Sequence, residues 1–216
     1  MVFQDEKGSK TVPSVFKEII KNEIGLIDIK LNKFSTVIDI GANVGIPSIF
    51  LAKKFPHSNF LIFEPVRENF ENLLKNIEAN NVKNIKAHNL AVTSDGRKFD
   101  MNVVLNDNSG GATGQITDLD KNKDSKHFRS SDSVTLDSIF EENKLKYVDL
   151  LKIDCEGSEH EILNSFSYLK NVRRVIGEVH INEPLKSKGY SFESFIELLN
   201  PLGEKNFKIK VIKMAE

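Results

Sequence analysis

Ionisable side chains follow two apolar segments of the chain, in an arrangement that could hold a substrate and move a proton. Residues 147–154 read YVDLLKID and run into CEG, and residues 172–180 read VRRVIGEVH. If both segments are strands, ionisable residues two positions apart share one face of each strand. Charged groups in a buried strand need a partner or a chemical task. The predicted catalytic residues are Asp154, Glu178, His180, Glu156 and Lys152.

Three interpretations of this group stay open from the residues alone. The side chains could position or deprotonate a substrate. Carboxylate and imidazole groups at two neighbouring strand ends would also suit a divalent metal, which is the second cofactor candidate, although no metal ligands are assigned. The third interpretation is that the charges only pair with one another inside the fold.

A glycine-containing loop follows another apolar segment and predicts close approach of a ligand to the backbone. Residues 36–47 read TVIDIGANVGIP. Glycine lets a ligand approach the main chain, and ligands of open α/β sheets bind beyond the carboxyl ends of strands. Asn43 replaces the middle glycine of G-x-G-x-x-G, so the dinucleotide fingerprint is not met. The loop is compatible with S-adenosylmethionine, and Glu64 at the next strand end could accept both ribose hydroxyls. A plain tight turn with a solvated Glu64 is the alternative.

The elements that must position these residues alternate between strands and helices. Short apolar segments predict buried parallel strands at 36–40, 59–64, 84–92, 147–154 and 172–180. Spacings of three and four between apolar residues predict helices at 46–54, 67–80, 158–166 and 191–199, and a leading helix lies within 11–30. The alternation indicates an α/β fold with a parallel sheet. Residues 206–213 alternate apolar side chains with lysine, which predicts a last, antiparallel edge strand with one solvated face.

The start of the helix predicted at 158–166 has a local interpretation. Ser158 precedes the helix and Glu161 lies three residues later, which is the spacing of a capping box. Ser158 and Glu161 are therefore predicted to be structural. Glu159 and His160 are predicted to lie on a solvated helix face.

Composition narrows the class of protein. The chain has 216 residues, a formal net charge of −1 and one cysteine. The near-neutral charge disfavours nucleic acid as a partner, and a single cysteine excludes an intramolecular disulfide framework. No apolar stretch reaches the length of a membrane span, and we expect no membrane partner and a cytoplasmic location. A monomer and a homodimer are both compatible with the sequence.

Five motifs in order resemble the FkbM family of S-adenosylmethionine-dependent methyltransferases. They are VIDIGANVG, FEP at 63–65, SVTLDSIF at 133–140, LLKIDCEGSEHEIL at 150–163 and EVH at 178–180. The resemblance implies a class I, Rossmann-like methyltransferase fold, with a mostly parallel seven-strand sheet and helices on both faces. It also implies methylation of a hydroxyl oxygen on a small molecule, sugar or glycan. The cofactor-binding residues it implies are Asp39, Gly41, Asn43, Gly45, Glu64, Asn89 and Ala91.

The expected organisation is an N-terminal helical segment at 1–35 and a methyltransferase domain at 36–216. A hairpin and loop insertion is expected at about 97–133, as either an ordered lid or a disordered insert. Two other functions compete with S-adenosylmethionine-dependent methyl transfer to a hydroxyl. They are an oxidoreductase that uses an NAD-type nucleotide and a non-catalytic module that binds S-adenosylmethionine. A nucleic-acid or protein methyltransferase is disfavoured by the charge and by the absence of an NPPY-type motif.

Overall fold

A single six-stranded sheet forms the centre of the molecule. The computed structural model describes residues 1–4, 11–102 and 128–213, so most of the predicted insertion lies outside the described residues. The strand order is β10-β9-β8-β1-β2-β3, and every neighbouring pair is parallel. The strands are β1 (Thr36–Ile40), β2 (Asn59–Phe63), β3 (Ile85–His88), β8 (Leu150–Ile153), β9 (Val175–Ile181) and β10 (Phe207–Lys213).

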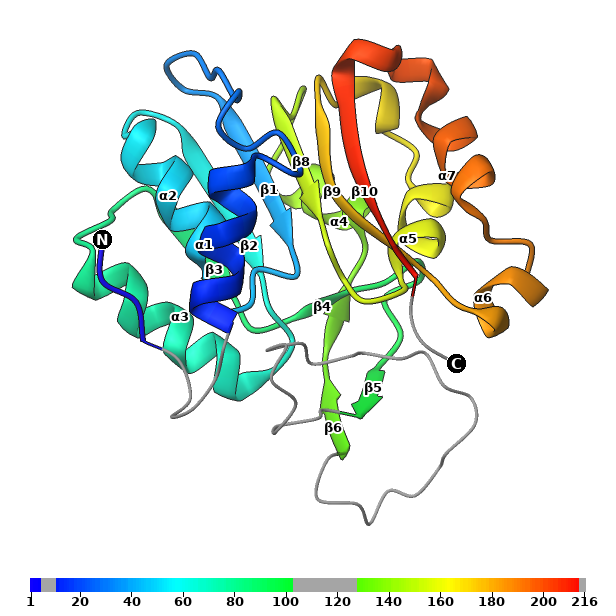
Figure 1. The fold of residues 1–216 in the computed structure, drawn as a ribbon, viewed down its shortest axis with the longest axis horizontal. Coiled ribbons are helices and arrows are strands. Elements are labelled where there is room, and N and C mark those ends of the chain that lie inside the picture. The colour runs from blue at the N-terminus through cyan, green and yellow to red at the C-terminus, as the bar shows by residue number, and fades with distance from the viewer. Residues whose placement is uncertain (5–10, 103–127, 214–216) are drawn as a thin grey trace.

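Helices cover both faces of this sheet (Figure 1). One face packs on α1 (Thr11–Lys21), α2 (Ile46–Lys54) and α3 (Arg67–Ala79), through buried side chains such as Ile19, Ile49 and Leu73. The other face packs on α4 (Leu136–Glu142), α5 (Glu159–Ser165) and α7 (Phe192–Leu199), through side chains such as Phe140 and Phe195. Because both faces are covered, the central strands are buried along their length, as a parallel sheet requires. The predicted α/β class with a parallel sheet is confirmed.

Two predictions about the sheet are wrong. The sheet has six strands among the described residues rather than seven, and β10 runs parallel to β9 rather than antiparallel. The alternating lysines of the last strand report which face is polar, and they carry no information on strand direction. The chain between β9 and β10 contains α6 (Glu183–Ser187) and α7, which together form the long crossover that a parallel pair needs.

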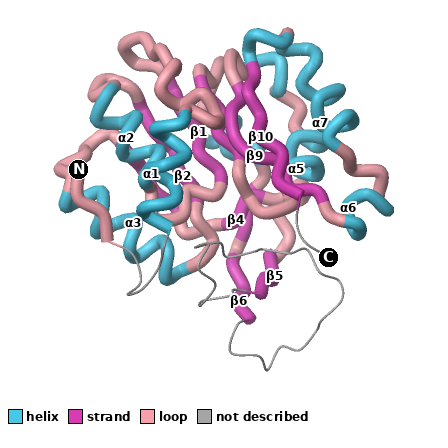
Figure 2. The backbone as a smooth tube through the Cα atoms, in the orientation of Figure 1, coloured by secondary structure: helices cyan, strands magenta, loops and turns pink. Residues whose placement is uncertain are grey.

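Short strands lie outside the central sheet, and Figure 2 shows β4, β5 and β6 below it. The strand predicted at 84–92 divides into β3 and β4 (Ala91–Val92), and β4 leaves the sheet to pair with β7 (Ser133–Val134). The expected hairpin is present as β5 (Phe99–Asn102) paired antiparallel with β6 (Phe128–Ser131). Residues of β4 and β5 lie beside the carboxyl ends of β1, β2 and β8.

The N-terminal helix α1 shares the core of the α2 face. Ile19, together with Leu26 and Ile29 in the following loop, is buried in the same cluster as β1 and α2. Three short 3-10 turns, η1 (Leu169–Asn171), η2 (Asn200–Leu202) and η3 (Glu204–Asn206), complete the elements. None of the helices in the described part of the chain is long and apolar enough to cross a bilayer.

Candidate active site

A cleft opens at the carboxyl edge of the sheet, beyond the ends of β1, β2 and β8. Six of the predicted site residues line it: Gly41, Asn43, Glu64, Ala91, Asp154 and Glu156. Six others do not line it: Asp39, Gly45, Asn89, Lys152, Glu178 and His180. The remaining lining residues are Ile40, Phe63, Pro65, Val66, Asn69, Leu90, Val92, Phe99, Cys155 and Ser158. Strand ends that are far apart in the sequence therefore form one site, as expected for an open α/β sheet.

Glu64 presents a buried carboxylate to this cleft. Its side chain is 4% exposed, and its Oε2 accepts a hydrogen bond from the backbone N–H of Asn43 at 2.7 Å. Its Oε1 accepts from the N–H of Val66 at 2.9 Å. Burial raises the pKa of Glu64 to about 7, against the opposite effect of these hydrogen bonds. The carboxylate is thus already oriented by the glycine loop and by the turn after β2.

Two positions of the glycine loop require glycine because of close packing, which the sequence alone did not reveal. Gly41 has φ +77°, and a Cβ built there would lie 1.8 Å from the carbonyl oxygen of Asp154. Gly45 has φ +86°, and its Cβ would lie 2.2 Å from Cδ1 of Leu73. Gly41 therefore lets the ends of β1 and β8 meet, whereas Gly45 lets α2 pack on α3. Within this loop, Gly41 and Asn43 reach the cleft and Gly45 does not.

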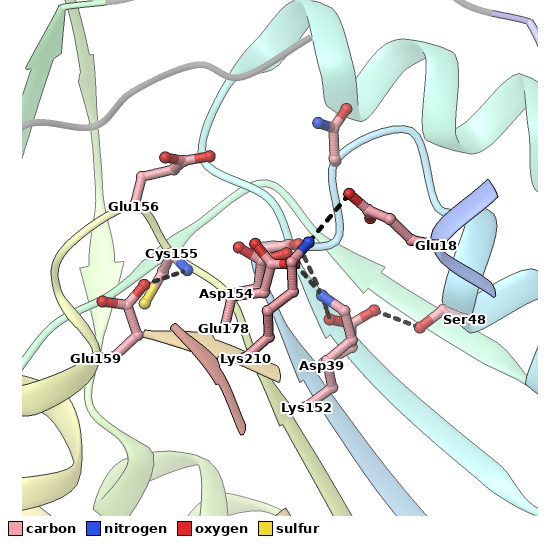
Figure 3. Close-up of polar contacts among 12 residues, drawn as sticks. Glu18, Asp39, Ser48, Lys152, Asp154, Cys155, Glu156, Glu159, Glu178 and Lys210 are labelled. Carbon is pink, nitrogen blue, oxygen red and sulfur yellow. Dashed lines mark hydrogen bonds and ion pairs between the residues drawn. The ribbon is translucent and has the colours of Figure 1, made fainter. Parts of the chain in front are cut away.

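Asp39 and Lys152 form a buried ion pair beneath the loop (Figure 3). The Nζ of Lys152 lies 3.0 Å from Oδ1 of Asp39 and donates to the carbonyl of Gly41 at 3.3 Å. Ser48 Oγ donates to the other oxygen of Asp39 at 2.6 Å. Burial alone would lower the pKa of Lys152, but the charges of Asp39 and Asp154 raise it above its usual value. Because Gly41 lines the cleft, the bond from Lys152 fixes the backbone at the base of the cleft.

Asn89 also acts on the backbone rather than on the cleft. Its Nδ2 donates to the carbonyl oxygens of Glu64 and Pro65, at 2.8 and 3.1 Å. The side chain therefore holds the turn that carries the Glu64 carboxylate. Ala91, two residues later in β4, is 3% exposed and lines the cleft.

The turn between β8 and α5 is organised by Glu159. This side chain is fully buried, at 0% exposed, and accepts hydrogen bonds from the N–H groups of Cys155 and Gly157, each at 3.0 Å. Its Oε1 also lies 2.9 Å from Nδ1 of His180. Burial by itself would raise the pKa of Glu159, but the contact with His180 and the N–H donors lower it. The carboxylate is therefore ionised.

The local predictions for this turn are wrong. Glu159 and His160 are buried rather than solvated, and His160 bonds to Ser191 and Ser194 near the start of α7. Ser158 makes no capping hydrogen bond with its side chain. Glu161 instead accepts from Ser94 Oγ and pairs with Arg97, at the base of the β5–β6 hairpin. A glutamate in a first helical turn carries no local sign of which partner a distant strand will supply.

Glu156 lines the cleft from this turn, as Asp154 does. Its backbone has φ +57°, a left-handed conformation that is uncommon outside glycine. Burial, together with the nearby charge of Asp154, raises the pKa of Glu156 to about 7, despite the opposing effect of His180. Its Oε2 lies 3.4 Å from Nε2 of His180. A carboxyl group with this pKa can exchange a proton near neutral pH.

Asp154, Glu178 and His180 converge, as their places in the sequence suggested. One ligand atom of each lies within 4.8 Å of the others. Lys210 of β10 also reaches this group: its Nζ lies 2.9 Å from Glu178 and bonds further to Glu18 and Glu23, so α1 is tied to β9 (Figure 3). Lys210 was missed because a lysine on an alternating edge strand looks solvated.

The chemistry of this donor set fits ion pairing better than a divalent metal. Burial alone would lower the pKa of His180, but Glu159 raises it to about 9, so the ring is protonated at neutral pH. A metal would have to displace that proton and compete with Lys210 for Glu178. Burial and the neighbouring Asp154 raise the pKa of Glu178, in opposition to Lys210. We assign no metal ligands.

Comparisons with known proteins agree with this geometry. Residues 39–209 match the model of the methyltransferase FkbM domain. A protein of Beauveria bassiana named methyltransferase 1 is 28% identical over 142 residues, which cover 60% of this chain and 57% of that protein. Methyltransferase sdnD of Sordaria araneosa is 25% identical over 194 residues, or 76% of this chain and 73% of that protein.

The chain is also similar to a solved methyltransferase structure. The precorrin-6y C5,15-methyltransferase of Geobacter metallireducens GS-15 is 12% identical, with a TM-score of 0.47, over 82% of this chain and 68% of that one. Of the Beauveria relative named above, the chain spans a little over half of the length. Since the family model covers most of the sheet and every residue that lines the cleft, this chain belongs to the FkbM methyltransferase family and has its class I methyltransferase fold.

Proposed function

We propose that this chain transfers a methyl group from S-adenosylmethionine to a hydroxyl oxygen of a small molecule, sugar or glycan. The observation that supports S-adenosylmethionine as the cofactor is the buried carboxylate of Glu64, which lines a cleft beside the glycine loop. The oxygen acceptor rests on the available base described below.

The residues of the cleft suit S-adenosylmethionine. Its lining combines apolar side chains with a few polar groups, as in many small-molecule sites. Glu64 would accept hydrogen bonds from the ribose hydroxyls, and Gly41 and Asn43 would contact the methionine portion. The apolar side chains of Val66 and Leu90 would frame the adenine. When bound, this cofactor supplies an electrophilic methyl group on a sulfonium.

The residues of this chain would then orient an acceptor and remove its proton. An aliphatic hydroxyl is a weak nucleophile and needs a base. Glu156 lines the cleft and has a pKa near 7, so its ionised form is present at neutral pH. His180 already holds a proton in this arrangement, so it would stabilise the Glu156 carboxylate rather than act as the base. Asp154 also lines the cleft and could position the acceptor.

A calorimetric titration with S-adenosylhomocysteine and with NAD tests the cofactor. We expect micromolar binding of S-adenosylhomocysteine only. Glu64→Gln should weaken it by at least tenfold, equivalent to about 1.4 kcal/mol. Glu71→Gln, on the exposed side of α3, is the matched control and should leave binding unchanged. Binding of NAD, or an unchanged affinity in Glu64→Gln, would contradict the proposal.

Acceptor screening then separates an enzyme from a non-catalytic binding module. Transfer of a labelled methyl group to hydroxylated small molecules and glycans is the expected result. Tight cofactor binding, with no transfer to any hydroxylated acceptor, would favour the binding module. Transfer to amines alone would contradict the hydroxyl assignment while leaving the cofactor assignment intact.

A further inference from the structure

Residues 1–4 lie beside α3 (Figure 1), where two buried asparagine side chains bind their backbone. Asn76 Oδ1 accepts a hydrogen bond from the N–H of Gln4 at 2.6 Å, and Asn76 Nδ2 donates to the carbonyl of Gln4 at 2.9 Å. Asn80, four residues later, makes the same two bonds with Val2. Positions two apart in an extended chain and four apart on a helix are both roughly 6–7 Å apart, so the two repeats match.

An aromatic contact fixes the same segment to α1. Phe3 lies between the two bonded residues, and its ring meets that of Phe16 edge-on, with 5.5 Å between the ring centroids. Both rings pack against the core cluster on the α2 face of the sheet. Residues 1–4 are therefore held by α1 and α3 together, through main-chain hydrogen bonds on α3 and a side-chain contact on α1.

Asn76 also reaches the glycine loop. Its Nδ2 donates to the carbonyl of Val44 at 2.9 Å, and the side chain is 0% exposed. An amide NH₂ group has two protons, and the carbonyls of Gln4 and Val44 accept both of them. Exchange of Oδ1 and Nδ2 by rotation would bring the amide oxygen against both carbonyls and break all three bonds. The bonds to Gln4 therefore fix the orientation in which Asn76 holds Val44.

Val44 occupies the part of the loop that orients the buried carboxylate of the cleft. The N–H of Asn43 donates to Glu64 at 2.7 Å, and the N–H of Val44 donates to Oδ1 of Asn43 at 2.7 Å. Asn43 and Gly45, on either side of Val44, both have a positive φ, at +51° and +86°. Such a conformation persists only where the surrounding contacts impose it. The bond from Asn76 is the contact that α3 supplies to the Val44 carbonyl, so its loss would loosen the turn that orients Glu64.

We propose that residues 1–4 position the glycine loop for cofactor binding, with Asn76 as the positioning residue that connects them. The segment then contributes to the S-adenosylmethionine site although none of its residues lines the cleft. This inference rests on the proposed function and adds to it a part of the chain outside the cleft. Asn76 acts through Val44 and touches neither the cofactor nor the acceptor.

Hydrogen exchange of the protein without ligands, followed by NMR, tests the connection directly. Gln4→Pro removes the N–H that Asn76 accepts. Val2→Pro is the matched control, because it removes the equivalent N–H on Asn80, whose side chain bonds to Val2 and to the carbonyl of Asn76. The amides of Asn43 and Val44 should exchange about tenfold faster in Gln4→Pro and at the unsubstituted rate in Val2→Pro. Unchanged rates in Gln4→Pro, or equal acceleration in both variants, would overturn the inference.

Cofactor affinity provides the second test. Gln4→Pro should weaken binding of S-adenosylhomocysteine by about tenfold and raise the KM for S-adenosylmethionine with kcat unchanged, whereas Val2→Pro should change neither. Both variants lose one bond to a buried asparagine, so a similar fall in melting temperature is expected for both. Asn76→Leu should weaken binding as Gln4→Pro does, and the two substitutions together should cause no further loss. Additive losses would show that the segment acts by another route and would overturn the role of Asn76.

The remaining outcomes separate this inference from the proposed function. Binding by the unsubstituted protein, with the same affinity in Gln4→Pro, would overturn this inference alone. Failure of the unsubstituted protein to bind S-adenosylhomocysteine would overturn the proposed function and, with it, the assignment of residues 1–4 to a cofactor site.

Discussion

The Nδ1 atom of His180 lies 2.9 Å from Oε1 of Glu159, and both side chains are buried. This contact joins the end of β9 to the first turn of α5. It keeps the imidazole protonated, because Glu159 raises the pKa of His180 to about 9 although burial alone would lower it. The other ring nitrogen then faces Glu156, at 3.4 Å. A pair that was not expected from the sequence thus controls the charge beside Glu156, the proposed base.

The first prediction is that the contribution of His180 to the free energy of unfolding falls at alkaline pH. Its pKa is about 9 in the folded chain, above the value of about 6.5 expected when unfolded. The stabilisation is therefore complete below about pH 6.5 and is lost as the pH rises through about 9. Urea unfolding of the protein and of His180→Gln should show a stability difference that shrinks over this range. The exposed His57→Gln is the control, and a constant difference for His180→Gln would contradict the prediction.

The second prediction concerns the base. With a pKa of about 7 for Glu156, kcat/KM for methyl transfer should rise with pH through about 7, because only the ionised carboxylate accepts a proton. Glu156→Gln should lower kcat by about 10²–10⁴-fold and remove this rise, while the affinity for S-adenosylhomocysteine stays unchanged. Glu142→Gln, on the exposed end of α4, should behave like the unsubstituted protein. Full activity of Glu156→Gln would eliminate Glu156 as the base.

The third prediction concerns the buried ion pair of Lys152 and Asp39. Lys152→Met leaves a buried carboxylate without its partner and should lower the free energy of unfolding by about 3–5 kcal/mol. The double variant Lys152→Met with Asp39→Asn should recover part of this loss, because no charge is then stranded. Lys86→Met, an exposed position on β3, should change stability by less than about 0.5 kcal/mol. A similarly small effect of Lys152→Met, measured in urea, would contradict a buried pair.

The fourth prediction separates backbone strain from collision in the glycine loop. Gly41→Ala would place a Cβ 1.8 Å from the carbonyl of Asp154, whereas a Cβ at Gly189 would meet nothing within 4 Å. Both residues have a positive φ, at +77° and +83°, so both variants carry the cost of a left-handed alanine, about 1–2 kcal/mol. Gly41→Ala should lose clearly more stability and should also weaken cofactor binding. Equal losses in thermal unfolding would show that β1 and β8 can separate without cost.

Local patterns were enough to determine the class of fold and the place of the site. The apolar segments TVIDI and NFLIF alternate with amphipathic segments such as RENFENLLKNIEA, and each pattern reports a local periodicity that survives in the structure. Because ligands of open α/β sheets bind at the carboxyl edge, strand-end residues such as Glu64 and Glu156 could be placed near a cleft without coordinates. The family motifs lie at these same strand ends.

Tertiary structure alone decided which charged residues meet and which are buried. Glu159 contacts His180 across 21 residues of sequence, and Lys152 contacts Asp39 across 113. No local pattern distinguishes such a residue from a solvated one, since burial and ion pairing depend on how distant strands and helices pack. The same reason explains why the predicted direction of β10 was wrong and why Ser158, which has the spacing of a helix cap, makes no capping hydrogen bond with its side chain.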